Sequence, residues 1–374
     1  MYYYIYPEAD TTLYQASGSQ NTGLDEIVEI TKTMSTSGGN IKVSRILMKF
    51  DLSEISKSIV DGTISNPKFY LNMYDANSQN LSTSQSLYAY PISQSWLEGQ
   101  GFSGDDPITT EGASWNFRDG QTQDTRWSAT VSASGGTWYT ASWASQSFEY
   151  ETDDMRMDVT PIVNKWLDET YPNEGFIIKR SGSLGNTDTN TDECSTDRLG
   201  TFKFFSRQTH TIYPPKLEVE WYDTAWNTGS LSPLTSANLE DLVFYMKSLR
   251  PEYKEKSKVK FRVVGRERYP TKSYSNTASE YLTAKYLPSG SVEQIGGTGA
   301  YYSVRDVQTE DVIISYGTGS LMSCDSTGNY FNLWMNGLQA ERYYKFEFKV
   351  VSGSNTSDET VQYFDDDFVF KVVR

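Results

Sequence analysis

One stretch of the chain has the pattern of a helix, whereas most of the remaining sequence alternates like β-strands. Apolar side chains recur there at i, i+3, i+4, i+7 and i+8, the spacing of one helix face: Val159, Ile162, Val163, Trp166 and Leu167. Pro161 suits a first helical turn, where its missing N–H costs nothing, and Asp158 or Thr160 supplies the capping oxygen. A single short helix among many strands predicts a helix that closes one end of a β-sandwich.

Composition and strand patterns extend this prediction to the whole chain. Aromatic residues make up 14% of the 374 residues, and such residues favour strands. The clearest strand is Val43–Phe50, with Ile46 and Met48 on one face and Arg45 on the other. We therefore predict a mainly β fold of two sandwiches: a jelly roll with one short helix at residues 1–223, a linker at 224–234, and an immunoglobulin-like sandwich at 235–374.

Charge and cysteine content narrow the classes of partner. The net charge of −15 predicts that the chain as a whole binds neither nucleic acid nor an anionic membrane, because both would repel it. Apolar runs stay shorter than the roughly 20 residues that span a bilayer, and the first residues lack the pattern of a secretory signal. Cys194 and Cys324 fall in different predicted domains, so we expect no disulfide scaffold and folding in a reducing cytoplasm.

A series of short motifs follows in order through the first 222 residues: Asp10-Thr11, Arg45-x-Leu47-x-x-Phe50-Asp51-Leu52-Ser53, Trp96-x-Glu98-Gly99, Ser114-Trp115-Asn116, Asp158-Val159-Thr160 with Trp166, Gly175-Phe176-Ile177-Ile178, Phe204-Phe205-Ser206 and Pro214-Pro215-Lys216-Leu217. In these motifs the chain resembles the DNRLRE family of β-jelly-roll domains, which look like carbohydrate-binding modules. The resemblance implies the jelly roll and places Trp96 and Trp115 in its core. It does not select a function, because such domains occur on surface proteins, enzymes and phage particles alike.

The start of the chain carries a second resemblance. Ile5-Tyr6-Pro7, Asp10–Tyr14 and Asn21-Thr22-Gly23-Leu24-Asp25-Glu26 are similar to the opening of structural proteins of T4-like marine phages, and Lys258–Pro270 has the same character. This resemblance implies a non-catalytic virion component of the tail, neck or baseplate, assembled in the host cytoplasm. Its partners would be other virion proteins and further copies of itself. The alternatives are a carbohydrate-binding module for host surface glycans and, third, a glycan-degrading enzyme.

Few residues suggest catalysis or metal binding. His210 is the one histidine, which excludes a site of several histidines, and nothing around it resembles a nucleophile arrangement. The 48 Asp and Glu residues offer many carboxylate pairs, but no motif selects a catalytic one. Asp188, Asn190 and Asp192 alternate as in calcium loops, yet Glu193 replaces the required glycine. We expect a solvated loop there, with calcium as the alternative, and no other cofactor.

Two further features predict binding surfaces. The loop-rich stretch 94–145 holds five of the nine Trp residues, and we expect Trp127, Trp138 and Trp143 at a surface, as contacts for a protein partner or a glycan. The stretch 247–272 carries ten basic residues against three Glu. Lys256, Lys258 and Lys260 alternate along a predicted strand face that is either solvated or docks onto an acidic neighbour.

Overall fold

The computed structural model describes residues 1–34, 41–128, 134–149, 154–183, 191–234, 242–269, 285–288, 298–352 and 360–374. The chain divides into two compact units. The N-terminal unit comprises Tyr4–Asp61 and Lys68–Val219, and the C-terminal unit comprises Met1–Tyr3, Gly62–Pro67 and Glu220–Arg374. Residues 224–234, predicted as a linker, belong to the C-terminal unit, where Trp226 forms a β-bridge with Cys324.

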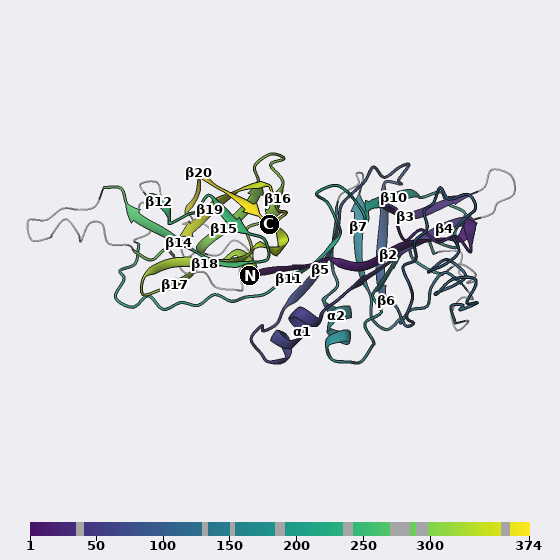
Figure 1. Ribbon diagram of the computed structural model, residues 1–374. Coiled ribbons are helices and arrows are strands. Elements are labelled where there is room, and N and C mark those ends of the chain that lie inside the picture. The colour runs from purple at the N-terminus through teal and green to yellow at the C-terminus, as the bar shows by residue number, and fades with distance from the viewer. Residues whose placement is uncertain are drawn as a thin grey trace, which may run out of the picture. The chain divides into compact units, whose positions relative to one another are not determined.

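Strands account for most of the regular structure up to residue 220 (Figure 1). The elements in this part of the chain are β1 (Tyr2–Ile5), β2 (Pro7–Tyr14), β3 (Ile27–Met34), β4 (Ile41–Phe50), α1 (Ser53–Val60), β5 (Lys68–Met73), β6 (Ser84–Pro91), β7 (Ala144–Glu149), β8 (Met155–Asp158), α2 (Thr160–Leu167), β9 (Phe176–Lys179), β10 (Gly200–Phe205) and β11 (Lys216–Glu220). One sheet has the order β1-β11-β5-β8. The other has the order β10-β3-β4-β9-β6-β7, with β2 also paired to β4.

The remaining elements form two sheets of the C-terminal unit. They are β12 (Leu242–Lys247), β13 (Glu252–Lys254), β14 (Lys258–Glu267), β15 (Gly299–Asp306), β16 (Val312–Ile314), β17 (Ser323–Asp325), β18 (Gly328–Trp334), β19 (Tyr343–Ser352) and β20 (Thr360–Val373). The sheet orders are β12-β14-β18-β17 and β13-β20-β19-β15-β16. Aromatic rings join the two sheets: Phe244 of β12 lies 4.7 Å from Phe348 of β19, and Phe261 of β14 lies 4.8 Å from Phe346.

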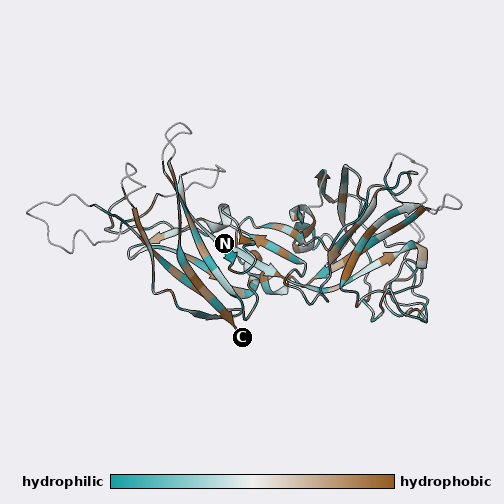
Figure 2. Ribbon diagram, turned by 90° about the horizontal axis from the view of Figure 1, so that it is seen from above, coloured by the Kyte–Doolittle hydropathy of each residue, from teal (hydrophilic) through white to brown (hydrophobic). Residues whose placement is uncertain are grey.

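The mainly β fold of antiparallel sheets that the sequence predicts is confirmed. Apolar and polar residues alternate along many of the strands (Figure 2), as expected for sheets with one face in a core. The predicted helix is α2, whose Ile162, Val163 and Trp166 are buried. The structure adds a second helix, α1, in which Ile55 is the buried residue.

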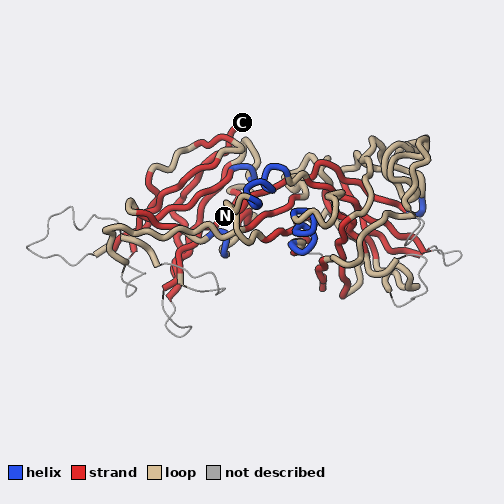
Figure 3. Tube along the Cα trace, turned by 90° about the horizontal axis from the view of Figure 1, so that it is seen from below, coloured by secondary structure: helices blue, strands red, loops and turns tan. Residues whose placement is uncertain are grey.

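The long stretch between β6 and β7 forms a third layer on the N-terminal unit. Sheet residues Leu13, Val43, Leu47 and Ile177 share one hydrophobic cluster with loop residues Ile92, Trp96, Ala113, Trp115, Trp127 and Trp138. The loops gather densely beside the strands of this unit in Figure 3. Strand β4 is therefore covered on both faces, which explains why its residues 43–48 are all buried. We call residues 92–138 the loop layer; its residues 129–133 are not described.

Candidate functional site

The loop layer places two of the predicted surface tryptophans in the interior, so the expectation that they lie at a surface is wrong. Trp127 and Trp138 are 3% and 7% exposed. The indole N–H of Trp127 donates to the Ser114 carbonyl at 2.9 Å, and the ring of Trp138 packs against Tyr90. Burial makes both side chains part of the core, and Trp127 in addition has its indole N–H satisfied. Trp96 and Trp115, predicted as core residues, are buried as expected.

Trp143 is the predicted tryptophan that remains at the surface. It is 51% exposed and lies just before the edge strand β7, with its ring 5.8 Å from that of Tyr88 on β6. The hydroxyls of Ser86 and Ser147, on paired residues of the same two strands, lie 2.9 Å apart. The exposed Trp143 and the half-buried Tyr88 therefore share the β6–β7 edge with two hydroxyl groups.

The face of β4 under the loop layer carries buried charges that the sequence did not predict. Arg45 was expected on a polar outer face, but it is fully buried because the loop layer covers that face. Its guanidinium forms two hydrogen bonds with the Glu193 carboxylate, at 3.0 and 2.5 Å. Lys179 of β9 lies 3.4 Å from the same carboxylate. The Arg45 guanidinium also lies over the rings of Trp115 and Trp138, at 4.6 and 5.0 Å.

Burial and ion pairing oppose each other in this cluster. Burial disfavours the charged form of Glu193, but Arg45 and Lys179 outweigh it and hold the pKa of Glu193 below its usual value. Burial lowers the pKa of Lys179 to about 8, although Glu193 favours its charged form. Both groups are therefore charged at neutral pH, and the paired charges stabilise each other in a site that excludes water.

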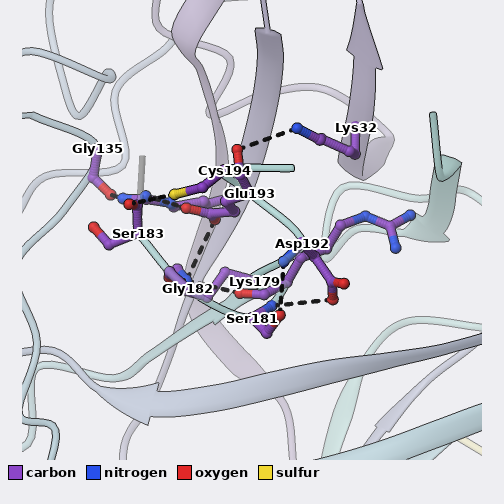
Figure 4. A network of polar contacts seen from close by, with 11 residues as sticks. Lys32, Gly135, Lys179, Ser181, Gly182, Ser183, Asp192, Glu193 and Cys194 are labelled. Carbon is purple, nitrogen blue, oxygen red and sulfur yellow. Dashed lines mark hydrogen bonds and ion pairs between the residues drawn. The ribbon is translucent and has the colours of Figure 1, made fainter. Parts of the chain in front are cut away.

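Cationic side chains of this region also donate hydrogen bonds to backbone carbonyls of the segment after β9 (Figure 4). Lys32 donates to the carbonyls of Glu193 and Ser195, at 3.1 and 2.7 Å. Lys179 donates to Arg180 and Gly182, and Arg180 donates to Leu199. Carbonyls of an irregular segment that turn away from solvent must find donors, and these side chains supply them. The cluster therefore has a structural role: its charged groups fasten one segment to the sheet.

Asn21 and Glu98, which belong to two of the sequence motifs described above, come together at another edge of the loop layer. Asn21 donates from its amide to the carbonyls of Glu98 and Ala113, at 2.6 and 2.8 Å. Its amide oxygen accepts from the backbone N–H of Gly101 at 2.9 Å, and its own N–H donates to Thr109 at 2.8 Å. The side chain and the backbone of this one residue thus hold three parts of the loop layer together.

Gly99 and Gly112 allow the backbone of the loop layer to come this close to Asn21. Gly99 has φ +83° and Gly112 has φ +101°, and a Cβ on Gly112 would lie 2.4 Å from the Cα of Gly99. A side chain at either position would be strained by the backbone conformation and would also collide with Asn21 or the facing strand of the loop. Glycine at position 99 of the Trp96-x-Glu98-Gly99 motif is therefore required by packing.

Three ionisable residues, Asp10, Glu98 and Arg207, lie beside the contacts of Asn21. Arg207 binds the Glu98 carboxylate through Nη1 at 2.9 and 2.8 Å, and its backbone N–H donates to Asp10 at 2.7 Å. Asp10 in turn donates its N–H to Glu98 at 3.0 Å. Burial raises the pKa of Asp10 to about 7, against the effect of the Arg207 hydrogen bond. These contacts join β2, the loop layer and the turn after β10.

The other predicted site residues do not come together. Asp188 and Asn190 lie outside the described residues, and Asp192 forms hydrogen bonds with Ser181 through its carboxylate and its N–H. Within the described ranges, no group of three or more His, Cys, Asp or Glu is placed to hold a metal ion. His210 is exposed and lies 3.6 Å from Glu26.

The predicted basic strand face is present on β14. Lys258 and Lys260 are exposed on this strand, and Lys256 is exposed in the turn that precedes it. Lys260 and Arg262 both bind Asp325 of β17, at 2.9 and 2.6 Å. Asp325 therefore neutralises part of the positive charge of Lys260 and Arg262, whereas Lys256 and Lys258 are exposed at the other end.

Comparisons with known proteins give few matches. No protein-family model and no curated protein matches the chain. A solved structure, a DUF4785 family protein from Legionella pneumophila, is similar at 9% identity with a TM-score of 0.19. That match covers 100% of this chain and 62% of the Legionella protein. Among the residues that the structure describes, no helix is both long and apolar enough to cross a bilayer.

Proposed function

We propose that the chain is a non-catalytic structural component of a tailed bacteriophage particle, in the tail, neck or baseplate, and acts by protein–protein assembly. The phage setting follows from the resemblance of its opening motifs. The assembly role is supported by the structure of the loop layer, which is fixed to the sheet and presents apolar groups outward. Its partners would be further copies of the chain and other virion proteins, assembled in the host cytoplasm.

The observation that carries this proposal is a set of three exposed apolar side chains on the loop layer. Leu97, Phe102 and Ile108 are 46–57% exposed. Each adjoins a residue that is hydrogen-bonded to Asn21, namely Glu98, Gly101 or Thr109. We call these three residues the platform. Apolar groups held on a rigid surface pay little ordering entropy on binding, so they suit a specific interface.

The chemistry of the buried groups also favours a structural role. Glu193 is held by Arg45 and Lys179, and Asp10 and Glu98 are held by Arg207. Groups engaged in this way stabilise the fold and have no open position for a substrate. We therefore assign these ionisable clusters to folding, and the function to the outer surface.

The platform predicts self-association that is insensitive to salt. The triple variant Leu97→Ser, Phe102→Ser and Ile108→Ser should raise the dissociation constant of the multimer at least about tenfold, because each substitution removes apolar contact area. The measurement is mass photometry of the full-length 42.4 kDa chain at about 500 mM salt, where exposed charges are screened.

A matched control replaces three exposed apolar residues outside the platform. Val60, Val312 and Val361 are 41–75% exposed, and changing all three to Ser should leave the multimer intact. A wild-type chain that is monomeric under these conditions, or a control that dissociates as readily as the platform variant, contradicts the assignment of the platform.

The second candidate function is carbohydrate binding at the β6–β7 edge. The observation that favours it is the exposed Trp143 ring beside Tyr88 and the hydroxyls of Ser86 and Ser147, because aromatic faces stack on sugar rings. A glycan array probed with the full-length chain tests it. Binding that is lost in Trp143→Ala but kept in Tyr269→Ala, at another exposed aromatic, supports this candidate; the absence of any glycan signal rejects it.

A further inference from the structure

Positive and negative charges are distributed unequally between the two units. The N-terminal unit contains 28 acidic residues against 16 basic residues. Five of those 16 cations are buried among the described residues: Lys32, Arg45, Lys179, Arg180 and Lys216. Only three carboxylates of this unit are buried there, those of Asp10, Glu193 and Glu218. More cations than carboxylates of this unit are buried. Acidic residues therefore make up a larger share of the charged groups at the surface of the N-terminal unit than in the unit as a whole.

The C-terminal unit carries a cluster of positively charged residues within a few positions of β14. Lys258, Lys260 and Arg262 alternate on β14, while Phe261 and Val263, on the opposite face of this strand, are buried. The three cations therefore share the outer face of the β12-β14-β18-β17 sheet. Lys254 ends β13 of the other sheet, and Lys256 lies in the turn that leads from β13 into β14, which is closed by the bond from the Ser257 N–H to the Lys254 carbonyl. We call Lys254, Lys256, Lys258, Lys260 and Arg262 the basic ladder.

The two ends of the basic ladder differ in how they are neutralised. Asp325 binds both Lys260 and Arg262, which cancels part of the charge at that end. For Lys254, Lys256 and Lys258, no carboxylate of the described residues lies within ion-pair distance, and all three side chains are exposed. Glu255 is the one acidic residue in the stretch 254–262. The ladder therefore presents a net positive end to solvent.

The aromatic neighbours of the ladder indicate what kind of partner it suits. Lys260 lies 3.6 Å above the ring of Tyr330, and Lys258 lies 5.3 Å from that of Trp334. These rings already carry the chain's own cations, so they are poorly placed to stack on a sugar or a nucleobase. What the face offers outward is ammonium groups, whose natural partners are surface carboxylates.

We infer that the basic ladder of one copy docks on the acidic surface of the N-terminal unit of a second copy. The contact joins different surfaces of the two copies, so it is heterologous and propagates into rings or open chains. This inference deepens the proposed assembly function by naming a second contact and its partner. It remains separable from the platform, because a contact between charged surfaces weakens as salt screens it, whereas an apolar contact does not.

The test compares two charge-reversal variants of equal charge by sedimentation velocity. The ladder variant is Lys254→Glu, Lys256→Glu and Lys258→Glu. The control variant is Lys42→Glu, Lys57→Glu and Lys68→Glu, at exposed lysines of the N-terminal unit. At about 20 mM salt, wild-type chains should form assemblies larger than the platform multimer, and about 300 mM salt should return them to that multimer. The ladder variant should associate at least about tenfold more weakly, whereas the control should associate as well as the wild type or better.

Three results would overturn the inference. One is a wild-type chain whose assemblies at about 20 mM salt are no larger than those at about 300 mM salt, and a second is a ladder variant that associates like the wild type. The third is an assembly of unchanged mass whose sedimentation coefficient changes with salt only when the ladder is intact, which would place the partner surface in the same chain. Far-UV circular dichroism of both variants checks that they fold. The platform is tested separately at about 500 mM salt, where contacts between exposed charges are screened.

Discussion

Replacing Trp127 with alanine should destabilise the N-terminal unit by about 3–5 kcal/mol, the cost of removing a large buried aromatic side chain. Trp127 fills the cluster between the loop layer and β4 and donates its indole N–H to Ser114. Its removal leaves a cavity under the loop layer and a carbonyl without its donor. Urea unfolding followed by far-UV circular dichroism measures the change, and limited proteolysis reports whether the loop layer opens first.

Trp143→Ala is the matched control, since it removes the same side chain from an exposed position. Its contact is the ring of Tyr88, and we expect a loss of at most about 1 kcal/mol. Equal unfolding midpoints for the two variants would contradict the division of these tryptophans into a core residue and a surface residue.

Glu193→Gln should destabilise the same unit by about 3–5 kcal/mol, because it leaves the buried cations Arg45 and Lys179 without a counter-charge. The substitution keeps the shape of the side chain, so the effect measures charge rather than packing. The ion pair Glu341–Lys371 of the C-terminal unit is exposed, and Glu341→Gln should leave the urea midpoint almost unchanged because solvent screens this pair.

The two substitutions are compared by their urea midpoints at pH 7. A stability change for Glu193→Gln as small as that for Glu341→Gln would show that the buried cluster is not paired as described. Replacing Arg45, Lys179 and Glu193 together by apolar residues of similar size should recover part of the loss, since the uncompensated charges are then absent.

Local patterns were sufficient to predict the architecture where one face of an element is apolar. The stripe from Val159 to Leu167 predicted α2, and the alternation of Ile46, Met48 and Phe50 predicted β4. Helix α1 was not predicted because its sequence lacks an apolar stripe: Ile55 is its buried residue, and most of its other positions are polar or exposed. Its start is marked by Asp51, whose carboxylate accepts from the Ser53 N–H.

The site could not be predicted because it depends on contacts between distant residues in irregular segments. Arg45 and Glu193 are 148 positions apart, and no periodicity links them. The loop layer has no repeating pattern, so nothing in the sequence showed that Arg45 lies beneath it or that Trp127 and Trp138 point inward. The motif residues Asn21, Glu98 and Gly99 were visible, but their convergence became evident only in the structure.

Hydrogen–deuterium exchange of the loop layer tests the central claim most directly, namely that this layer is a rigid part of the fold that presents the platform. The amides of Asn21, Gly101 and Ala113 are hydrogen-bonded within it. We predict that peptides covering residues 97–118 exchange as slowly as those of β4, because their amides open only when the unit unfolds. Complete exchange of these peptides within seconds, with β4 still protected, would contradict the account and leave the platform without a rigid support.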